Sequence, residues 1–359
     1  MYYFCRVNKH QKYINRCIAL AKNGLGTTYP NPLVGSVVVF NDEIIGEGWH
    51  KKAGEPHAEV NAIKSVKDKT LLLKSTIYVS LEPCSHFGKT PPCADLIIQY
   101  KIPNVVIGTL DPNEKVAGNG IKKLIEAGTH VTIGILEKEC TNLNKRFFTY
   151  HQKKRPYIIL KWAETEDGYI APDKTLRQVD HTKLEPIWIT NNHSRQMVHK
   201  WRTEEQAILV GTNTVLNDNP SLNARSFYGS SPIRIVLDKS GKINESFHVK
   251  NNSLKTIFLT ENKDFKSTKN CIYEYCAFDS HLIQNIIEIL VKHNIQSLIV
   301  EGGSQTIQTF IDENTWDEAR IFKGKNMFKK GLKAPIIKGL TVKKINLLDD
   351  QLILLKNHD

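Results

Sequence analysis

Hydrophobic and polar positions in the first part of the chain follow the spacings typical of helices and strands. Apolar side chains three and four residues apart predict a helix over 8–23 that ends at Gly24. The same spacing predicts helices over 57–66, 93–100 and 118–127. Short apolar runs predict strands over 33–40, 43–48, 76–81, 104–109 and 130–135, with a turn at Asn41-Asp42. Strands that alternate with helices indicate an α/β sheet with helices on its faces.

A second α/β pattern begins at Tyr157, after the polar and basic run at 149–156. Predicted strands cover 157–162, 188–190, 207–211, 233–237, 256–259 and 297–300. Predicted helices cover 193–201 and 281–293, and a closing β-hairpin is predicted over 342–356 around Asp349-Asp350. We therefore expect two α/β domains, residues 1–150 and 151–359, in agreement with a chain of 359 residues.

Composition and charge narrow the class of protein. A hydrophobic fraction of 40% and a charged fraction of 24% are ordinary for globular chains and exclude a wholly disordered or fibrous one. The longest apolar run is far shorter than the roughly 18 residues of a membrane span. The first residues lack the apolar region of a secretory signal, which predicts a cytoplasmic protein.

The net charge of +12 is spread evenly, because residues 1–150 carry +6 and residues 151–359 carry +6. No block of five or six like charges is present. This dispersion argues against a nucleic-acid-binding tail or stripe and is compatible with small phosphorylated substrates.

The residues that point to chemistry are one histidine and two of the seven cysteines. His57, Cys84 and Cys93 offer an imidazole and two thiolates, which suit zinc. Three protein ligands leave a fourth position for water, as in catalytic zinc sites. Glu59 follows His57 by two residues in the first turn of a predicted helix, where its carboxylate can transfer protons without binding the metal. The pattern H-x-E…P-C…C is that of zinc nucleobase deaminases, with a longer spacing between the cysteines than usual.

Two other interpretations remain open at this level. A structural zinc site would need a fourth protein ligand, for which His50 and His86 are the nearby candidates. A deaminase that acts on nucleic acid, with a non-catalytic accessory domain, would need a basic face and aromatic platforms near the metal.

The loop between the cysteines, PCSHFGKTPPC at 83–93, resembles the deaminase domain of the bifunctional riboflavin-biosynthesis deaminase/reductase family. The segments NPLVG (31–35), GEPHAEVNA (54–62) and DPN (111–113) resemble it too, and together they span most of 10–150. The resemblance implies a cytidine-deaminase-like domain in which five residues hold a phosphorylated pyrimidine. These are Asn31, His50, Lys89, Asp111 and Asn113.

The second half resembles the reductase domain of the same family, which has a dihydrofolate-reductase-like fold. The matching segments are KWAETEDGYIA (161–171), WIT (188–190), AILVGTNTVLNDNPSLNAR (207–225) and VEGGS (300–304). The resemblance implies that NADPH contacts Ala163, Trp188, Thr214, Asp218, Gly303, Ser304, Gln305, Thr306, Ile307, Gln308 and Thr309. It implies that the substrate contacts Pro186, Arg202, Leu222, Arg225 and Glu301. Two of these, Arg202 and Arg225, are chemically suited to clamp a ribose phosphate.

The chain departs from the family pattern in three places: 172–187 lacks the usual glycine-rich turn, Lys239 follows Asp238, and 322–330 is unusually polar. The resemblance nevertheless implies two activities. One is zinc-dependent deamination of diaminohydroxyphosphoribosylaminopyrimidine. The other is NADPH reduction of the ribosyl group to yield 5-amino-6-(5-phosphoribitylamino)uracil. It also implies one zinc ion per chain and a homo-oligomer, most simply a dimer built through the reductase domain.

Overall fold

The computed structural model describes residues 9–85, 91–113, 117–173 and 187–358. The chain divides into two compact units, Met1–Lys154 and Arg155–Asp359, here called the first unit and the second unit. Each has its own sheet and its own buried core. No helix among the described residues is long and apolar enough to cross a membrane.

The first unit is built on a five-stranded sheet with the order β2-β1-β3-β4-β5. Strands β3, β4 and β5 run parallel, and β1 lies antiparallel to both β2 and β3. The strands are β1 Gly35–Phe40, β2 Glu43–Trp49, β3 Thr76–Leu81, β4 Asn104–Thr109 and β5 His130–Ile133. Asn41 and Asp42 join β1 to β2 with positive φ angles, which suit the twist of a tight hairpin.

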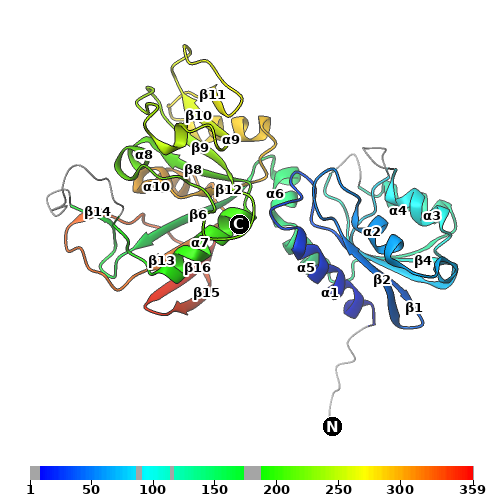
Figure 1. Ribbon diagram of the computed structural model, residues 1–359. Helices are drawn as coiled ribbons and strands as arrows, with labels where there is room; N and C mark the ends of the chain where they lie inside the picture. The colour runs from blue at the N-terminus through cyan, green and yellow to red at the C-terminus, as the bar shows by residue number, and fades with distance from the viewer. Residues whose placement is uncertain (1–8, 86–90, 114–116, 174–186, 359) are drawn as a thin grey trace, which may run out of the picture. The chain divides into compact units, whose positions relative to one another are not determined.

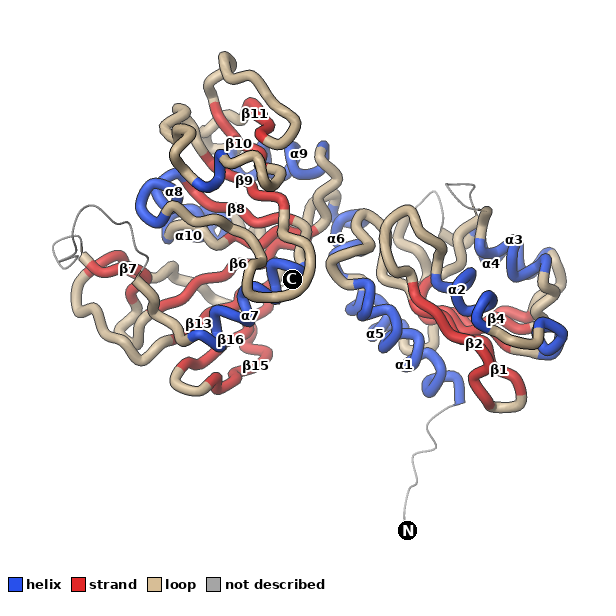
Figure 2. The backbone as a smooth tube through the Cα atoms, viewed as in Figure 1, coloured by secondary structure: helices blue, strands red, loops and turns tan. Residues whose placement is uncertain are grey.

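Helices cover both faces of this sheet (Figure 2). The α-helices are α1 Lys9–Ala21, α2 Ala58–Ser65, α3 Cys93–Gln99, α4 Asn119–Glu126, α5 Glu137–Leu143 and α6 Lys145–Lys153. Alternation along β1 explains the two layers, because Val37 and Val39 pack with α1 whereas Val38 packs with α2. The predicted elements of this half are confirmed, but α5 and α6 were not predicted, and α6 continues into the basic run at 149–156.

The second unit contains a nine-stranded sheet with the order β11-β10-β9-β8-β12-β6-β13-β16-β15 (Figure 1). The first seven strands of this order run parallel, and β16 and β15 complete the sheet in antiparallel pairing. The strands are β6 Tyr157–Glu164, β8 Ala207–Gly211, β9 Ile233–Leu237, β10 Thr256–Thr260, β11 Cys271–Tyr275, β12 Ser297–Val300, β13 Glu318–Lys323, β15 Leu340–Leu347 and β16 Asp350–Lys356. A separate pair joins β7 Tyr169–Pro172 to β14 Gly331–Lys333.

Four α-helices accompany this sheet: α7 Asn192–Glu204, α8 Thr212–Asp218, α9 Leu282–Lys292 and α10 Ser304–Asp312. The predicted closing hairpin is confirmed as β15 and β16. The predicted strand at 188–190 is wrong, because these residues are irregular and Trp188 is half exposed. Three apolar residues are too short a run to decide a strand without a pairing partner. Strands β7, β11, β13 and β14 and helix α8 were not predicted.

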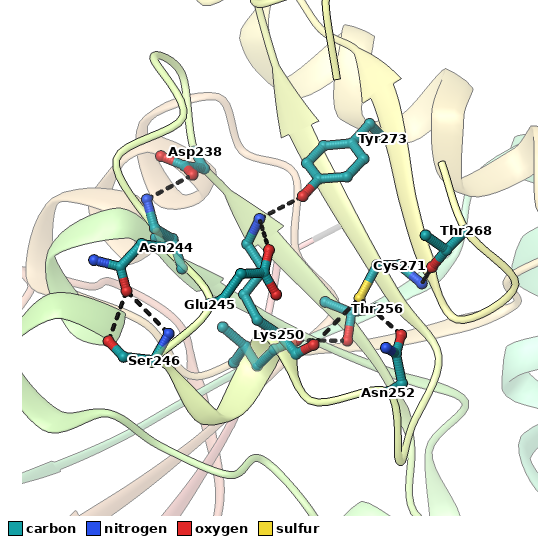
Figure 3. A network of polar contacts seen from close by, with 12 residues as sticks. Asp238, Asn244, Glu245, Ser246, Lys250, Asn252, Thr256, Thr268, Cys271 and Tyr273 are labelled. Atoms are coloured by element: carbon teal, nitrogen blue, oxygen red, sulfur yellow. Dashed lines mark hydrogen bonds and ion pairs between the residues drawn. The ribbon is translucent and has the colours of Figure 1, made fainter. Parts of the chain in front are cut away.

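The connection between β9 and β10 is anchored by two buried cations, and Figure 3 shows the contact of one of them, Lys250, with Tyr273. The Lys250 ammonium lies 4.5 Å from the ring centre of Phe258 and hydrogen-bonds the Tyr273 hydroxyl. The Arg234 guanidinium donates to the carbonyl oxygens of His248 (2.9 Å) and Leu254 (3.0 Å). Because buried charges need such partners, residues 248–254 at the end of this connection are held to the sheet.

Candidate functional site

The three predicted metal ligands come together in the first unit. His57 is the N-cap residue of α2, Cys84 follows β3, and Cys93 begins α3. The His57 Nδ1 atom lies 3.5 Å from the Cys84 Sγ atom and 3.4 Å from the Cys93 Sγ atom. Tetrahedral zinc with ligand bonds of about 2.1–2.3 Å separates its ligands by about 3.6 Å, so these atoms fit zinc.

Among the residues that the structure describes, no fourth ligand joins this cluster. His50 lies beside His57, with 5.3 Å between the ring centres, but its Nδ1 atom is 3.2 Å from the Pro56 carbonyl oxygen. That nitrogen therefore carries the hydrogen, and the Nε2 atom accepts from the Asn31 amide at 3.1 Å. His86 lies outside the described residues. The geometry is that of a three-ligand site with an open position.

Glu59 occupies the second residue of α2 and is only 3% exposed. Burial raises the pKa of its carboxyl group to about 7, and the neighbouring Cys84 thiolate adds to the rise. The Oε2 atom is buried and has no hydrogen-bond partner among the described residues. A buried carboxylate oxygen without a partner is costly, and its presence beside a three-ligand site suits a group that exchanges protons with a bound reactant.

Asp111 and Asn113, two further predicted substrate contacts, lie at the same edge of the sheet as the metal cluster. Strands β3 and β4 are parallel neighbours, so Cys84 after β3 and Asp111 after β4 emerge at the same edge. The Asp111 side chain accepts from the Asn113 backbone N–H at 2.8 Å, which forms a tight turn. Lys89 lies outside the described residues.

The second unit contains a cavity of about 1140 Å³. It is lined by most of the residues predicted to contact NADPH or the substrate: Ala163, Trp188, Arg202, Thr214, Asp218, Leu222, Arg225, Glu301, Gly303 and Ile307. These residues come from β6, α7, α8 and α10, from the segment before α7, and from the segments that follow α8 and β12. Pro186 lies outside the described residues.

Glu301 is the centre of a buried ion cluster in this cavity. The Arg202 guanidinium donates to both Glu301 carboxylate oxygens, at 3.3 and 2.7 Å, and the Lys161 ammonium lies 3.8 Å away. Burial by itself would raise the pKa of Glu301, but Arg202 and Lys161 outweigh it and lower that pKa to about 2. Arg202 is thus neutralised within the protein, which leaves Arg225 as the better candidate for a phosphate.

Two cavity residues were not singled out from the sequence. The side chain of Lys161, 15% exposed, lies beside Glu301, and burial lowers the pKa of its ammonium group. His199 is 7% exposed, and burial, followed by Arg202 and Arg225, lowers its pKa to about 4. The charge at position 161 within an apolar strand was the available signal for Lys161, whereas the sequence around His199 carried none.

The predicted cofactor run at 303–309 only partly faces the cavity. Gly303 and Ile307 line it, with Gly303 at a positive φ of 58°. The Ser304 hydroxyl instead donates to the Lys333 carbonyl oxygen at 2.9 Å, and the Gln308 amide oxygen accepts from Ile336 at 2.9 Å. The side chains of Ser304, Gln305, Thr306, Gln308 and Thr309 do not line the cavity, so a bound group there would meet chiefly the backbone N–H groups of α10.

Comparisons with known proteins match both halves of the chain. Residues 7–109 match the cytidine and deoxycytidylate deaminase zinc-binding region, and residues 156–326 match the RibD C-terminal domain. The riboflavin biosynthesis protein RibD of Aquifex aeolicus is 40% identical over 326 residues, which cover 90% of this chain and 88% of that protein. The Escherichia coli RibD protein is 33% identical, with 86% of each chain covered.

Two solved structures are similar to this chain over nearly its whole length. The chain is similar to a diaminohydroxyphosphoribosylaminopyrimidine deaminase/5-amino-6-(5-phosphoribosylamino)uracil reductase from Thermotoga maritima, with a TM-score of 0.85 and 38% identity over 98% of this chain and 99% of that one. It is also similar to Acinetobacter baumannii RibD, with a TM-score of 0.85 and 29% identity over the same shares of the two chains. Because both halves match in one order and over nearly the full length of these relatives, the chain belongs to the RibD family of riboflavin biosynthesis proteins.

Proposed function

We propose that the protein is a bifunctional enzyme that first deaminates diaminohydroxyphosphoribosylaminopyrimidine and then reduces the ribosyl group of the product with NADPH. The observation that carries the proposal is the coexistence of two distinct sites in one chain. The first unit holds a three-ligand metal cluster beside the buried Glu59 carboxylate, and the second holds a large cavity with a buried ion cluster. We assign deamination to residues 1–150 and reduction to residues 151–359.

In the first unit, His57, Cys84 and Cys93 would hold a zinc ion, which would supply the Lewis acidity that makes water nucleophilic at neutral pH. Water adds to the amino-bearing ring carbon, and Glu59 accepts a proton from it. Glu59 then returns the proton to the amino nitrogen, the carbon–nitrogen bond breaks, and ammonia leaves. A pKa of about 7 suits a carboxyl group that both accepts and donates protons.

Recognition of the pyrimidine in this site is assigned to Asn31, His50, Asp111, Asn113 and Lys89. The Asn31 amide and the His50 imidazole are joined by a hydrogen bond of 3.1 Å, which fixes the orientation of both. Amide and imidazole groups match the donors and acceptors on the edge of a pyrimidine ring.

In the second unit, the cavity lined by Ala163, Trp188 and Thr214 would hold NADPH, which would supply a hydride to the first carbon of the opened ribosyl group. Arg225 is assigned to the substrate phosphate, because Arg202 is already paired with Glu301. The Lys161 and Glu301 pair supplies buried polar groups that hold the sugar hydroxyls in place. The backbone N–H groups at the start of α10 face an anionic group of the cofactor.

A deaminase acting on nucleic acid, with a non-catalytic second domain, is not favoured. The second half matches a reductase domain, and relatives named as riboflavin biosynthesis proteins align across both halves. The even distribution of charge, +6 in each half, argues in the same direction.

We further propose that the protein forms a homodimer through the second unit. Among the described residues, β15 is the last strand of its sheet, so one of its edges lacks a neighbouring strand. Leu340 and Val342 on this strand are 59% and 53% exposed. The N–H and C=O groups of an edge strand can pair with those of a second copy. Light scattering on the parent and on a Val342→Glu variant tests this, with a shift from dimer to monomer expected for the variant.

The enzymatic proposal is tested with purified protein and diaminohydroxyphosphoribosylaminopyrimidine, with ammonia and NADPH followed separately. Without NADPH, ammonia release is expected to proceed, and the deaminated compound is expected to accumulate. With NADPH, oxidation is expected to lag behind ammonia release, because the deaminated compound is the reductase substrate. NADPH oxidation without any ammonia release contradicts the proposed order of the two reactions.

A further inference from the structure

Glu82 is a buried carboxylate that the proposed reaction does not use. It is 4% exposed and lies directly after β3, two residues before the metal ligand Cys84. Its Oε2 atom accepts from the backbone N–H groups of Asp111 (3.3 Å) and Gly118 (3.0 Å). Its Oε1 atom accepts from the Gly120 backbone N–H at 3.0 Å. Hydrogen bonds to a charged acceptor are stronger than neutral ones, so this carboxylate is a firm anchor.

Two of the three bonds fasten the start of α4 to the end of β3, and the third fastens Asp111 there. The N-cap residue of α4 is Gly118, which has no side chain to cap the helix. Glu82 supplies the missing acceptor from another element, and its negative charge suits a helix N-terminus. The first turn of α4 lies close to the segment after β3, because a Cβ atom at Gly120 would lie 2.1 Å from the Pro83 carbonyl oxygen. A side chain at position 120 would therefore force the helix away from the metal-binding segment.

The anchored segment also contains the turn assigned to the substrate. The Asp111 backbone N–H donates one of the three bonds, and the Asn113 carbonyl oxygen accepts from the Ala117 N–H at 2.9 Å. Glu82 thus contacts both ends of the segment from Asp111 to Gly120. Cys84 follows the same end of β3, two residues after Glu82, so this one carboxylate connects the segment of the metal ligand to the substrate turn.

We propose that Glu82 is a positioning residue for deamination, which sets the Asp111–Asn113 turn at the correct distance from the metal ligands and Glu59. The inference rests on the deaminase function proposed above. Both Glu82 oxygens are occupied by backbone N–H groups, so this side chain acts through the turn and not on the reacting atoms. Its removal is expected to impair binding of the pyrimidine more than it impairs zinc binding or the chemical step.

The test is Glu82→Gln, which keeps the shape but turns one of the two acceptors into an N–H donor facing N–H groups. Steady-state ammonia release is expected to show a KM raised by about tenfold or more, since losing a hydrogen bond to a charged group costs about 1.5–3 kcal/mol. The turnover number is expected to fall by a smaller factor, and zinc is expected to stay at one ion per chain. NADPH oxidation on the already deaminated substrate is expected to match the parent.

The matched control is Glu126→Gln, on the same helix α4 but with its side chain 65% exposed, and it is expected to leave KM unchanged. Should Glu82→Gln fail to fold, Glu82→Asp, which keeps the charge on a shorter side chain, is expected to fold and to raise KM by a smaller factor. An unchanged KM in whichever folded variant is measured overturns the positioning role. Loss of zinc with an unchanged KM for the zinc-loaded fraction also overturns it. A parent protein that releases no ammonia refutes the deaminase function instead.

Discussion

Arg202 and Glu301 form a bidentate ion pair in the cavity of the second unit, with the Arg202 Nη2 atom 2.7 Å from the Glu301 Oε2 atom. The two side chains are 12% and 8% exposed, so the pair is shielded from water. The arrangement differs from a simple phosphate clamp, because the Arg202 charge is already balanced within the protein. Arg202 therefore has two effects, one on the substrate site and one on the stability of the unit.

Arg202→Ala is expected to destabilise the second unit and to weaken reduction. Removing one partner of a buried ion pair leaves an uncompensated charge and costs about 3–5 kcal/mol. Lys161, 3.8 Å from Glu301, keeps the cost near the lower end of that range. Urea unfolding followed by tryptophan fluorescence measures the loss, since Trp162, Trp188, Trp201 and Trp316 all belong to the second unit.

The same variant tests whether the two halves work independently. Ammonia release by Arg202→Ala is expected to match the parent, while the KM for the deaminated substrate rises. Conversely, Glu59→Gln is expected to reduce that substrate with NADPH at the parent rate. If both folded variants lost both activities, the assignment of one activity to each half would be wrong.

Glu59→Gln is expected to lower ammonia release by about 10²–10⁴-fold, because the amide cannot accept a proton. Zinc content is expected to stay near one ion per chain, since Glu59 is not among the three clustered ligands. Metal analysis and an ammonia assay on the same preparation check both statements. Near-parental ammonia release by a zinc-loaded variant contradicts the role of Glu59.

Removal of zinc is expected to affect one reaction only. Treatment with a chelator, or the substitution Cys93→Ala, is expected to abolish ammonia release, because two ligands do not hold zinc firmly. NADPH oxidation on the already deaminated substrate is expected to continue. A Cys140→Ala variant serves as the control, because Cys140 is a buried cysteine outside the metal cluster. Retention of zinc in Cys93→Ala contradicts the ligand assignment.

Acid is expected to destabilise the second unit in two separate pH ranges. The pKa of His199 is about 4 in the folded state and 6.5 ordinarily, so the unfolded state binds the proton more tightly, and stability falls as pH drops from 6.5 to 4. The pKa of Glu301 is about 2 against an ordinary 4.5, so a further loss is expected between pH 4.5 and 2. The unfolding free energy is measured across this pH range. In His199→Gln it is expected to depend less on pH between 6.5 and 4, and in Glu301→Gln it is expected to depend less on pH between 4.5 and 2.

The metal site was predictable from sequence because its ligands are chemically distinctive and each follows a strong local signal. His57 and Glu59 lie at the start of a predicted helix, and Cys84 follows a predicted strand. The soft ligand set itself restricts the choice of metal, whatever the fold around it. The order of strands and helices in each half was readable for a similar reason, since apolar periodicity is a local property.

The cavity of the second unit was less predictable from single residues. Nothing in the local sequence shows that Arg202 on α7 meets Glu301 after β12, 99 residues later in the chain. Strand β13 escaped prediction because it carries the buried, ion-paired Arg320, which interrupts the apolar pattern. Both features depend on partners that only the folded chain brings together.

The sequence by itself determined the α/β class, and it predicted the division into two halves and the three metal ligands, because these depend on local periodicity and on ligand chemistry. Only the tertiary structure decided which partners each buried carboxylate has. It placed Glu301 between Arg202 and Lys161, and it placed Glu82 against three backbone N–H groups of another segment. The physical reason is that the energy of a buried carboxylate depends on the donors and cations around it, and distant segments supply those.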